Sequence, residues 1–330
     1  MKIGITGATG ILGARLTDYL MQKNLDIKVL IRNVSKEDAG RNNKIKKLLD
    51  SGIKIHEGSL DAPASLASFV KDMDVCIHLA AQVSFASAKK YRQSNVVGTK
   101  NLCNAIIENN PECRLIHCST TGVLVMRKTL KFLNSEYTNS KYETEKVVDD
   151  FMSNKGLKST IIYPCMIYGP GDYNFLPVLI LYLQQKKIPL VSSGEKNFPA
   201  VYIDDLCELF HLASKDEKSI GKRYGTVKSR GMGIHDFIKK VALKAGCPLP
   251  SMKISRTFLM LVAILLKMIH YLFRFKGNPG LTKVIVEALS LSCKENYQTA
   301  YNDISWEPKI GVDEGLELTF NWMKSNELID

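Results

Sequence analysis

The sequence predicts an α/β protein with a doubly wound parallel sheet and a smaller, discontinuous C-terminal substrate lobe. Three observations support this fold class. Short β-branched runs alternate with helical segments through the first half of the chain, and a glycine-rich turn, Gly7 to Gly13, follows the first run. The 330 residues are 45% hydrophobic and 24% charged, an ordinary globular balance with room for one large or two smaller domains.

The first strand, turn, helix and second strand form one continuous unit. Residues 3–6 are rich in β-branched side chains, an amphipathic helix runs from the turn to about Gln22, and residues 27–31 form the second strand. Glycines let the backbone approach a pyrophosphate, which rests on free N–H groups at the start of the helix. This is the opening of a Rossmann-type dinucleotide-binding domain. The cofactor contacts predicted in the turn are Gly7, Thr9, Gly10, Ile11, Leu12 and Gly13.

The end of the second predicted strand bears on the choice of cofactor. Sites specific for NAD usually place an acidic residue there to bind the ribose hydroxyls. Here Ile31 and Arg32 occupy these positions. A cation suits the additional phosphate of NADP, so the sequence favours NADP over NAD. The alternative is that Arg32 is an exposed loop arginine.

The alternation of strands and helices continues to residue 163. Two of the strands end in small or hydroxyl-bearing residues. Ala80 and Ala81 can let a flat ligand lie against the backbone, and Ser119 and Thr120 stand at the carboxyl edge, where a doubly wound sheet carries its chemistry. The strands predicted after residue 31 are 53–56, 75–81, 115–120 and 159–163, and the helices are 44–50, one that ends near Lys71, 95–109 and 135–155.

A tyrosine and a lysine stand four residues apart at the start of the last of these helices. Asn134 or Ser135 can cap its N-terminus and Gly156 follows its end, so Tyr137 and Lys141 lie on one face, one turn apart. A phenol has an ordinary pKa of about 10, which a nearby cation lowers. Such a pair can pass a proton to or from an alcohol oxygen.

Composition excludes several other classes of function. The six histidines show no metal-ligand spacing, so no metal site is predicted, and the eight cysteines include no C-x-x-C pair. The apolar pattern starts at Ile3, which together with the free cysteines predicts a reducing, cytoplasmic location. The net charge of +12 suits an anionic ligand or surface, but no nucleic-acid-binding motif accompanies it. We therefore expect a lysine-rich solvated surface and no nucleic-acid partner.

Taken together, the motifs resemble those of the extended short-chain dehydrogenases/reductases, in the epimerase/dehydratase and 3β-hydroxysteroid dehydrogenase-like part of that superfamily. They occur in family order and cover almost the whole chain. The matching segments are Thr6 to Gly13, His78 to Ala81, Asn95 to Thr99, Cys118 to Val123, Tyr137 to Lys141, Tyr163 to Asp172, Val201 to Leu206 and the S-W-E-P that contains Trp306.

The resemblance implies a role for each matching position. Tyr137 is the expected acid/base, and Lys141 is expected to lower its pKa and to hold the nicotinamide ribose. Thr120 matches the residue that hydrogen-bonds the substrate oxygen, with Ser119 as a candidate second donor, and Asn95 matches a position that supports the active-site helix. Cofactor contacts are also implied for Leu60, Leu79, Ala80, Ala81, Asn95, Pro164, Met166 and Ile167.

The chain departs from the family pattern at two positions that affect function. Ser59 stands where the family usually has the Asp of G-D-L, so the carboxylate of that adenine contact is missing. Thr121 and Gly122 follow Thr120, where 4,6-dehydratases carry Asp-Glu. Without that acid/base pair for water elimination, a dehydratase is not expected.

The resemblance also implies how the chain divides. Residues 1–169 form the cofactor domain, with 198–227 returning to it, and residues 170–197 and 228–330 form the substrate lobe. Basic residues at 228–230 could meet an anionic substrate, although solvated surface is the favoured interpretation. A homodimer is an expectation of the family alone.

One segment of the lobe, residues 256–275, has an unusual pattern. Nine apolar residues, 258–266, are too few to span a bilayer. The basic side chains Arg256, Lys267, His270 and Arg274 fall on one stripe, a pattern that can lie in a membrane interface with the basic groups toward lipid headgroups. We favour the alternative, a lobe helix that buries its wide apolar face in the protein or in a dimer.

The sequence thus predicts an NADP-preferring oxidoreductase that acts on a carbonyl/secondary alcohol pair of a small molecule, like a 3β-hydroxysteroid dehydrogenase or dihydroflavonol reductase. A nucleotide-sugar epimerase with recycled NAD is the main alternative, and Arg32 in place of an acid weighs against it. A non-catalytic NADP sensor on the same fold is a remote alternative, because the Tyr137–Lys141 pair is retained.

Overall fold

A seven-stranded, all-parallel sheet forms the centre of the molecule, with the strand order β10-β6-β5-β4-β1-β2-β3. The computed structural model describes residues 1–32, 39–126, 134–173, 175–186, 188–191, 198–228, 232–273, 275, 280–290, 292–294 and 296–329. The strands of this sheet are β1 (Lys2–Thr6), β2 (Asp26–Ile31), β3 (Lys54–Glu57), β4 (Val75–His78), β5 (Arg114–Cys118), β6 (Ser159–Tyr163) and β10 (Arg223–Gly225). The order reverses between β1 and β4, and ligands of doubly wound sheets bind in the crevice at such a reversal.

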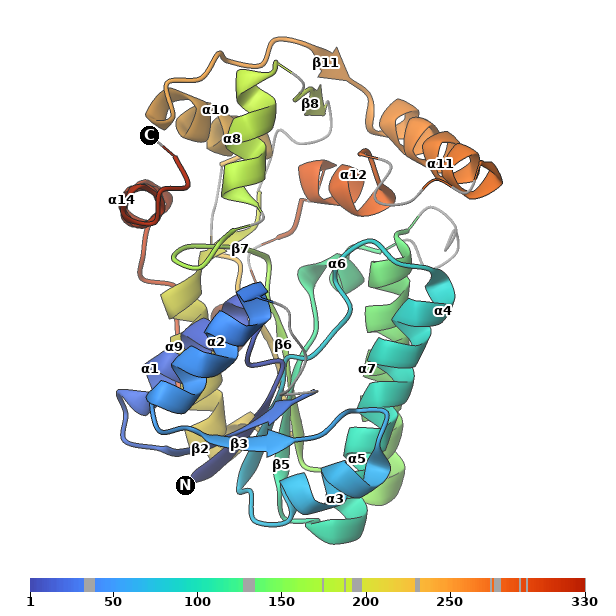
Figure 1. Cartoon of the computed structure of the whole chain (residues 1–330), viewed down its shortest axis with the longest axis vertical. Helices are drawn as coiled ribbons and strands as arrows, with labels where there is room; N and C mark the ends of the chain where they lie inside the picture. The colour runs from blue at the N-terminus through green and yellow to red at the C-terminus, as the bar shows by residue number, and fades with distance from the viewer. Residues whose placement is uncertain are drawn as a thin grey trace.

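Helices cover both faces of the sheet, so the predicted doubly wound α/β fold is confirmed (Figure 1). One face carries α1 (Ile11–Met21) and α9 (Ile203–Lys215), and the other carries α3 (Pro63–Val70), α5 (Gly98–Asn109) and α7 (Glu136–Lys155). The remaining helices of the sheet region are α2 (Ala39–Asp50), α4 (Ala88–Tyr91), the π-helical turn η1 (Arg92–Val97), α6 (Thr121–Leu124), the 3-10 turn η3 (Glu217–Ser219) and α13 (Gln298–Ile304).

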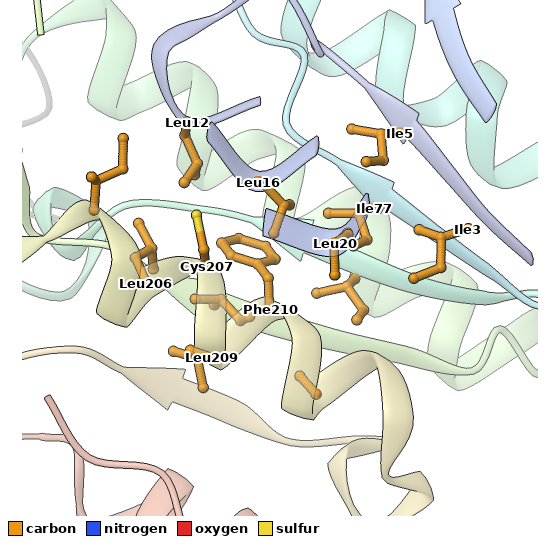
Figure 2. Packing of buried hydrophobic residues seen from close by; sticks show 14 of the residues in the cluster. Ile3, Ile5, Leu12, Leu16, Leu20, Ile77, Leu206, Cys207, Leu209 and Phe210 are labelled. Carbon is orange, nitrogen blue, oxygen red and sulfur yellow. The ribbon is translucent and has the colours of Figure 1, made fainter. Parts of the chain in front are cut away.

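Figure 2 shows how α1 and α9 share one core layer. Leu12, Leu16 and Leu20, at helical spacing on α1, face Leu206 and Phe210 of α9 above the β1 side chains. A bidentate ion pair joins the two helices at the edge of this layer. Arg15 Nε lies 2.5 Å and Nη2 2.7 Å from the two carboxylate oxygens of Asp204.

Segments late in the chain return to the sheet. Strand β10 pairs with β6, and the Trp306 indole N–H donates to the Asp205 carbonyl at 2.9 Å. The Asp205 carboxylate in turn accepts the backbone amides of Lys309 and Ile310 at 3.1 and 2.9 Å. These contacts explain why the motifs at 201–206 and around Trp306 belong to one structural unit, whereas the proposed division into two domains remains a prediction.

The other elements gather beyond the carboxyl ends of the strands, above the sheet in Figure 1. A core formed by α8, α10 and α14 and a separate small core between α11 and α12 hold them together. Their bounds are α8 (Leu176–Gln184), α10 (Ile234–Lys244), α11 (Arg256–Leu272), α12 (Lys283–Ser290) and α14 (Val312–Ser325), with the paired strands β7 (Met166–Tyr168) and β9 (Ala200–Tyr202) and β8 (Leu190–Val191) and β11 (Lys253–Ile254).

Helix α11 buries only part of its apolar surface in the protein. Only Leu259, Met260 and Ala263 are buried, while most of its other large apolar side chains are exposed, so a single copy of the protein does not bury the wide apolar face. Burial of that face in a dimer stays a prediction. Two cations of the predicted basic stripe face the protein, because Lys267 pairs with Glu136 and Arg256 Nε donates to Ser290 Oγ at 3.0 Å. Arg274, the last cation of the predicted stripe, lies outside the described residues. Within the described ranges, no helix is both long and apolar enough to cross a bilayer.

Candidate active site

Helix α7 forms where the sequence predicts it and presents Tyr137 and Lys141 near its start. The Ser135 side chain caps the helix by accepting the Thr138 amide at 3.0 Å, and Gly156 ends it with a left-handed φ of 71°. Val148 and Phe151 bury the middle of the helix against the sheet. The helix is therefore held rigidly at both ends and along its length.

Lys141 joins this helix to the carboxyl end of β5. Its buried ammonium donates to the carbonyl of Cys118, the last residue of the strand, at 2.5 Å. Thr120, two residues further on, caps the short helix α6, and its hydroxyl accepts the Gly122 amide at 3.4 Å. A Cβ added to Gly122 would lie 3.3 Å from Thr138 Oγ1, so this turn lies against the first turn of α7. The fold thus brings Thr120, Tyr137 and Lys141 to one edge of the sheet.

Burial has the largest effect on the electrostatics of Tyr137. Burial raises the pKa of Tyr137 above that of an ordinary phenol, with smaller contributions from Cys118 and Tyr91. The Lys141 ammonium is held on the Cys118 carbonyl, and burial lowers the pKa of Lys141 itself. The lowering of the Tyr137 pKa that the resemblance implies for Lys141 therefore stays a prediction.

Ser119 does not act with Thr120, contrary to the expectation of a second donor. Successive residues of an extended strand point to opposite faces, and Ser119 points into the layer beneath α7. Its buried hydroxyl donates to the carboxylate of Glu145. Since that proton is engaged inside the protein, Ser119 serves the packing of α7 against β5.

Glu145 is the central member of a buried polar cluster that the sequence analysis missed. It lies one helical turn beyond Lys141, and it accepts the Tyr163 hydroxyl at 2.9 Å besides the Ser119 hydroxyl. Arg223 Nη1 donates to Tyr163 Oη at 2.6 Å, and its ion pair with Glu145 measures 3.4 Å. Burial raises the pKa of Glu145, whereas the hydrogen bonds from Ser119 and Tyr163 lower it by a smaller amount. In the sequence, the only indication of Glu145 was its position four residues after Lys141.

Asn95 clamps the active-site helix, as the resemblance implies. It sits in η1, where its amide oxygen accepts the Gln82 N–H at 2.7 Å and its amide nitrogen donates to Ser140 Oγ at 2.9 Å. The Ser140 hydroxyl in turn donates to the Tyr137 carbonyl at 2.7 Å. Asn95 thereby connects the segment after β4 to the turn of α7 that lies between Tyr137 and Lys141.

The glycine turn makes a cradle that side chains would fill. Gly7 has a φ of +81°, and a Cβ there would lie 2.7 Å from the Ala80 amide nitrogen. A Cβ on Gly13 would lie 2.1 Å from the Gly7 carbonyl oxygen, so α1 packs directly on the turn. Helix α1 begins without a side-chain cap and without an acidic residue in its first turn. These features fit the pyrophosphate of a dinucleotide.

The other predicted cofactor contacts lie around the same edge. Arg32 directly follows β2 and is exposed. A Cβ on Gly98, at the start of α5, would lie 3.0 Å from Leu60 Cβ, and the Pro164 carbonyl accepts the Thr121 amide at 2.9 Å. The remaining positions are Thr9, Ile11 and Leu12 in the turn and first helix, Leu79 and Ala81 after β4, and Met166 and Ile167 in β7. In the part of the chain that the structure describes, no three His, Cys, Asp or Glu residues are grouped to hold a metal ion.

Two buried histidines lie side by side on β4 and β5, in register with one another. His78 is hydrogen-bonded through Nδ1 to Thr6 Oγ1 at 2.7 Å and through Nε2 to Thr99 Oγ1 at 2.8 Å. The ring of His117 lies 5.6 Å from that of His78, and neither of its nitrogens has a hydrogen-bond partner among the described residues. Burial lowers the pKa of both rings, and Lys141 lowers them further.

Comparison with known proteins agrees with this architecture. The 2-alkyl-3-oxoalkanoate reductase of Stenotrophomonas maltophilia (strain K279a) is 24% identical over 333 residues, which cover 96% of this chain and 97% of that protein. The decarboxylating sterol-4-alpha-carboxylate 3-dehydrogenase of Schizosaccharomyces pombe is 23% identical over 339 residues, which cover 97% and 96%. The solved structure of UDP-glucose 4-epimerase from Thermotoga maritima matches with a TM-score of 0.72 and 19% identity, over 99% of this chain and 100% of that chain.

The family described as the NAD dependent epimerase/dehydratase family matches residues 3–225, which is more than half of the chain. The relatives aligned over almost the full length are named as a reductase and a dehydrogenase. The chain belongs to the NAD dependent epimerase/dehydratase family and is an NAD(P)-dependent enzyme of the extended short-chain dehydrogenase/reductase type.

Proposed function

We propose that the protein is an NADP-preferring oxidoreductase that interconverts a carbonyl and a secondary alcohol on a small molecule, with Tyr137 as acid/base. The observation that carries the proposal is the arrangement of Tyr137 and Lys141 on α7, anchored through the Cys118 carbonyl beside Thr120. A bound nicotinamide dinucleotide supplies or accepts the hydride.

The residues of the chain manage the proton and the orientation of the substrate oxygen. In the direction of reduction, Tyr137 donates its hydroxyl proton to the carbonyl oxygen as negative charge develops there. The Thr120 hydroxyl donates a hydrogen bond to the same oxygen and stabilises that charge. The Lys141 ammonium keeps a positive charge one turn from the phenol, which stabilises the phenolate left after transfer.

A preference for NADP is proposed from Arg32. The residue follows β2 at the edge where the sheet receives the ribose next to the adenine, and a guanidinium can bind the additional phosphate there. Arg32→Ala is expected to weaken NADPH binding at least about tenfold, the effect of losing one charge-assisted contact, and to leave NADH binding nearly unchanged. Titration of the purified protein with both nucleotides measures the difference. Equal losses for the two nucleotides would contradict this role.

The substrate is proposed to be a 3-oxo or 3-hydroxy compound with a substantial apolar part. The names of the two relatives aligned over almost the full chain, a 2-alkyl-3-oxoalkanoate reductase and a sterol-4-alpha-carboxylate 3-dehydrogenase, support this class. Both names include a carboxylate, and the net charge of +12 favours an anionic substrate. A panel of alkyl-substituted 3-oxo acids, with simple ketones for comparison, is the first set to assay.

Tyr137→Phe tests the proposed chemistry. Loss of the hydroxyl is expected to lower kcat by about 10²–10⁴-fold, the usual contribution of a positioned acid/base, while nucleotide affinity changes little. Tyr142→Phe, on the same helix but half-exposed, is the matched control and should keep normal turnover. Normal turnover of Tyr137→Phe would refute the assignment.

The nucleotide released on denaturing the purified protein distinguishes the main alternative. Weak retention with an NADPH preference agrees with a net reductase. Tightly retained NAD would instead indicate internal recycling, as in a nucleotide-sugar epimerase, and would make nucleotide sugars the next substrates to assay.

A further inference from the structure

Helix α11 has two apolar faces, and the protein covers only one of them. Leu259, Met260 and Ala263 pack on Val286 of α12 in a small core. On the other side, apolar residues recur every three or four positions, so they line one continuous stripe. The exposed large apolar residues of the helix and of the segment after it are Phe258, Leu261, Leu265, Met268, Ile269, Tyr271, Leu272, Phe273 and Phe275.

The side chains of this stripe are largely exposed to solvent. Leu265 is 55% exposed, Leu272 is 74% exposed and Tyr271 is 88% exposed. Single exposed apolar residues are common on protein surfaces, whereas a contiguous group of this size marks an interaction site. Figure 1 places α11 at the periphery of the lobe, on the outer side of α12, so its outer face is open to a large flat partner.

The charge around the helix indicates the kind of partner. The fifty residues 237–286 contain no Asp or Glu. Lys239, Lys240 and Lys244 of this segment belong to α10, where Lys240 and Lys244 pair with Asp313 and Glu317, and Lys267 and Lys283 pair with Glu136. Its other cationic residues are Lys253, Arg256, Arg274 and Lys276. Lys253 and Arg256 stand at the start of α11, and Arg274 and Lys276 follow its end in the sequence. Basic residues at both ends of an apolar stripe are complementary to an anionic lipid surface. A symmetric contact between two copies through α11 would bring the same positive segment against itself, which like-charge repulsion disfavours.

The length of α11 determines how it could meet lipid. Its 17 residues extend about 25 Å, less than the roughly 30 Å of a bilayer core. A helix of this length with one face held by the protein can lie in the plane of the interface. We propose that the outer face of α11 docks the protein on an anionic membrane surface, with Leu261, Leu265 and Leu272 inserted among the acyl chains.

The docked helix would be connected directly to the active site. Lys267 of α11 pairs with Glu136, the residue before Tyr137, and Lys283 lies 3.6 Å from the same carboxylate. Glu287 of α12 accepts the Ser135 amide at 2.5 Å and the Thr138 hydroxyl at 2.9 Å, so it also holds the first turn of α7. A membrane surface at α11 therefore lies next to the end of the helix that carries Tyr137.

The test is binding of the full chain to lipid vesicles, measured by co-sedimentation. The wild type is expected to bind phosphatidylcholine vesicles that contain phosphatidylglycerol, to bind pure phosphatidylcholine vesicles much less, and to lose binding as salt is raised. The double variant Leu265→Glu/Leu272→Glu is expected to lower the partition coefficient at least about tenfold, because two inserted apolar side chains are lost. Leu243→Glu, at a 63% exposed position of α10, is the matched control and should bind as the wild type does.

A second variant keeps the proposal testable if the double variant folds poorly. Leu272→Trp places a fluorophore in the stripe, and its emission is expected to shift to shorter wavelength when phosphatidylglycerol vesicles are added. Absence of that shift, equal binding to neutral and anionic vesicles, or unchanged binding of the double variant would overturn the proposal. A dimer that forms without lipid and is lost in the double variant, measured by sedimentation velocity, would overturn it in favour of a second copy of the chain.

Discussion

Replacing His117 by Leu is expected to stabilise the protein, whereas the same change at the neighbouring His78 is expected to destabilise it. Both rings are buried, but only His78 is hydrogen-bonded through both nitrogens, to Thr6 and Thr99. His78→Leu would leave those two buried hydroxyls without their partner. His117 has no partner for either nitrogen among the described residues, and a buried unsatisfied polar group costs about 1–3 kcal/mol. Leucine has a similar volume and does not carry that cost.

The same rings make the free energy of unfolding depend on pH. Burial lowers the pKa of His78 to about 3 and holds the pKa of His117 well below its usual value, while unfolded histidine titrates at about 6.5. Below that pH the unfolded chain binds more protons, so stability present above about pH 6.5 is lost as the pH falls toward the folded pKa. At pH 5, about 1.5 pH units below the unfolded pKa, each ring has lost about 2 kcal/mol, or about 4 kcal/mol together.

Urea unfolding followed by circular dichroism, at about pH 7.5 and about pH 5, measures both effects. His117→Leu is expected to gain about 1–3 kcal/mol at the higher pH and about 3–5 kcal/mol at the lower pH, because it no longer contributes one of the two proton uptakes on unfolding. A destabilised His117→Leu protein at neutral pH, or one with the pH dependence of the wild type, would refute the reasoning. Destabilisation at neutral pH would mean that a ring nitrogen of His117 makes a hydrogen bond in the folded protein.

Three further predictions concern residues around the site. Gly13→Ala places a methyl group 2.1 Å from the Gly7 carbonyl oxygen, so NADPH affinity in a fluorescence titration should fall at least about tenfold. Gly311→Ala, where a Cβ meets nothing within 4 Å, should leave that affinity unchanged. Asn95→Ala removes the hydrogen bonds to Gln82 and Ser140, and urea unfolding should show a loss of about 2–3 kcal/mol together with a lower kcat; a wild-type kcat would contradict its clamping role. Burial lowers the pKa of Lys141, and the negative charge of Glu145 raises it. Glu145→Gln removes that charge, so the alkaline limb of the kcat–pH profile should move to lower pH. Asp149→Asn, one helical turn further along α7, should leave that limb in place.

Local patterns in the sequence were sufficient for the framework of the fold and the centre of the site. A strand, a glycine turn and a helix follow one another within about twenty residues, and backbone geometry makes that order diagnostic. The Tyr137–Lys141 spacing places both side chains on one helical face whatever the rest of the chain does. The end of the helix at Gly156 was also predicted correctly, and of the two candidate caps, Asn134 and Ser135, the structure uses Ser135. Both features depend only on neighbouring residues.

Tertiary structure decided the features that depend on contacts between distant segments. Ser119 was a candidate second donor to the substrate oxygen. Its hydroxyl instead donates to Glu145, which is 26 residues away in the sequence. The Cys118 carbonyl that holds the Lys141 ammonium is 23 residues away in the sequence, so that contact also depends on how the chain packs. The apolar pattern of α11 is nearly the same on both sides, so periodicity could not tell which side packs on α12. Residues close in sequence determine local conformation through sterics and hydrogen bonding, whereas the partner of a buried charge or of an apolar face depends on how the whole chain packs.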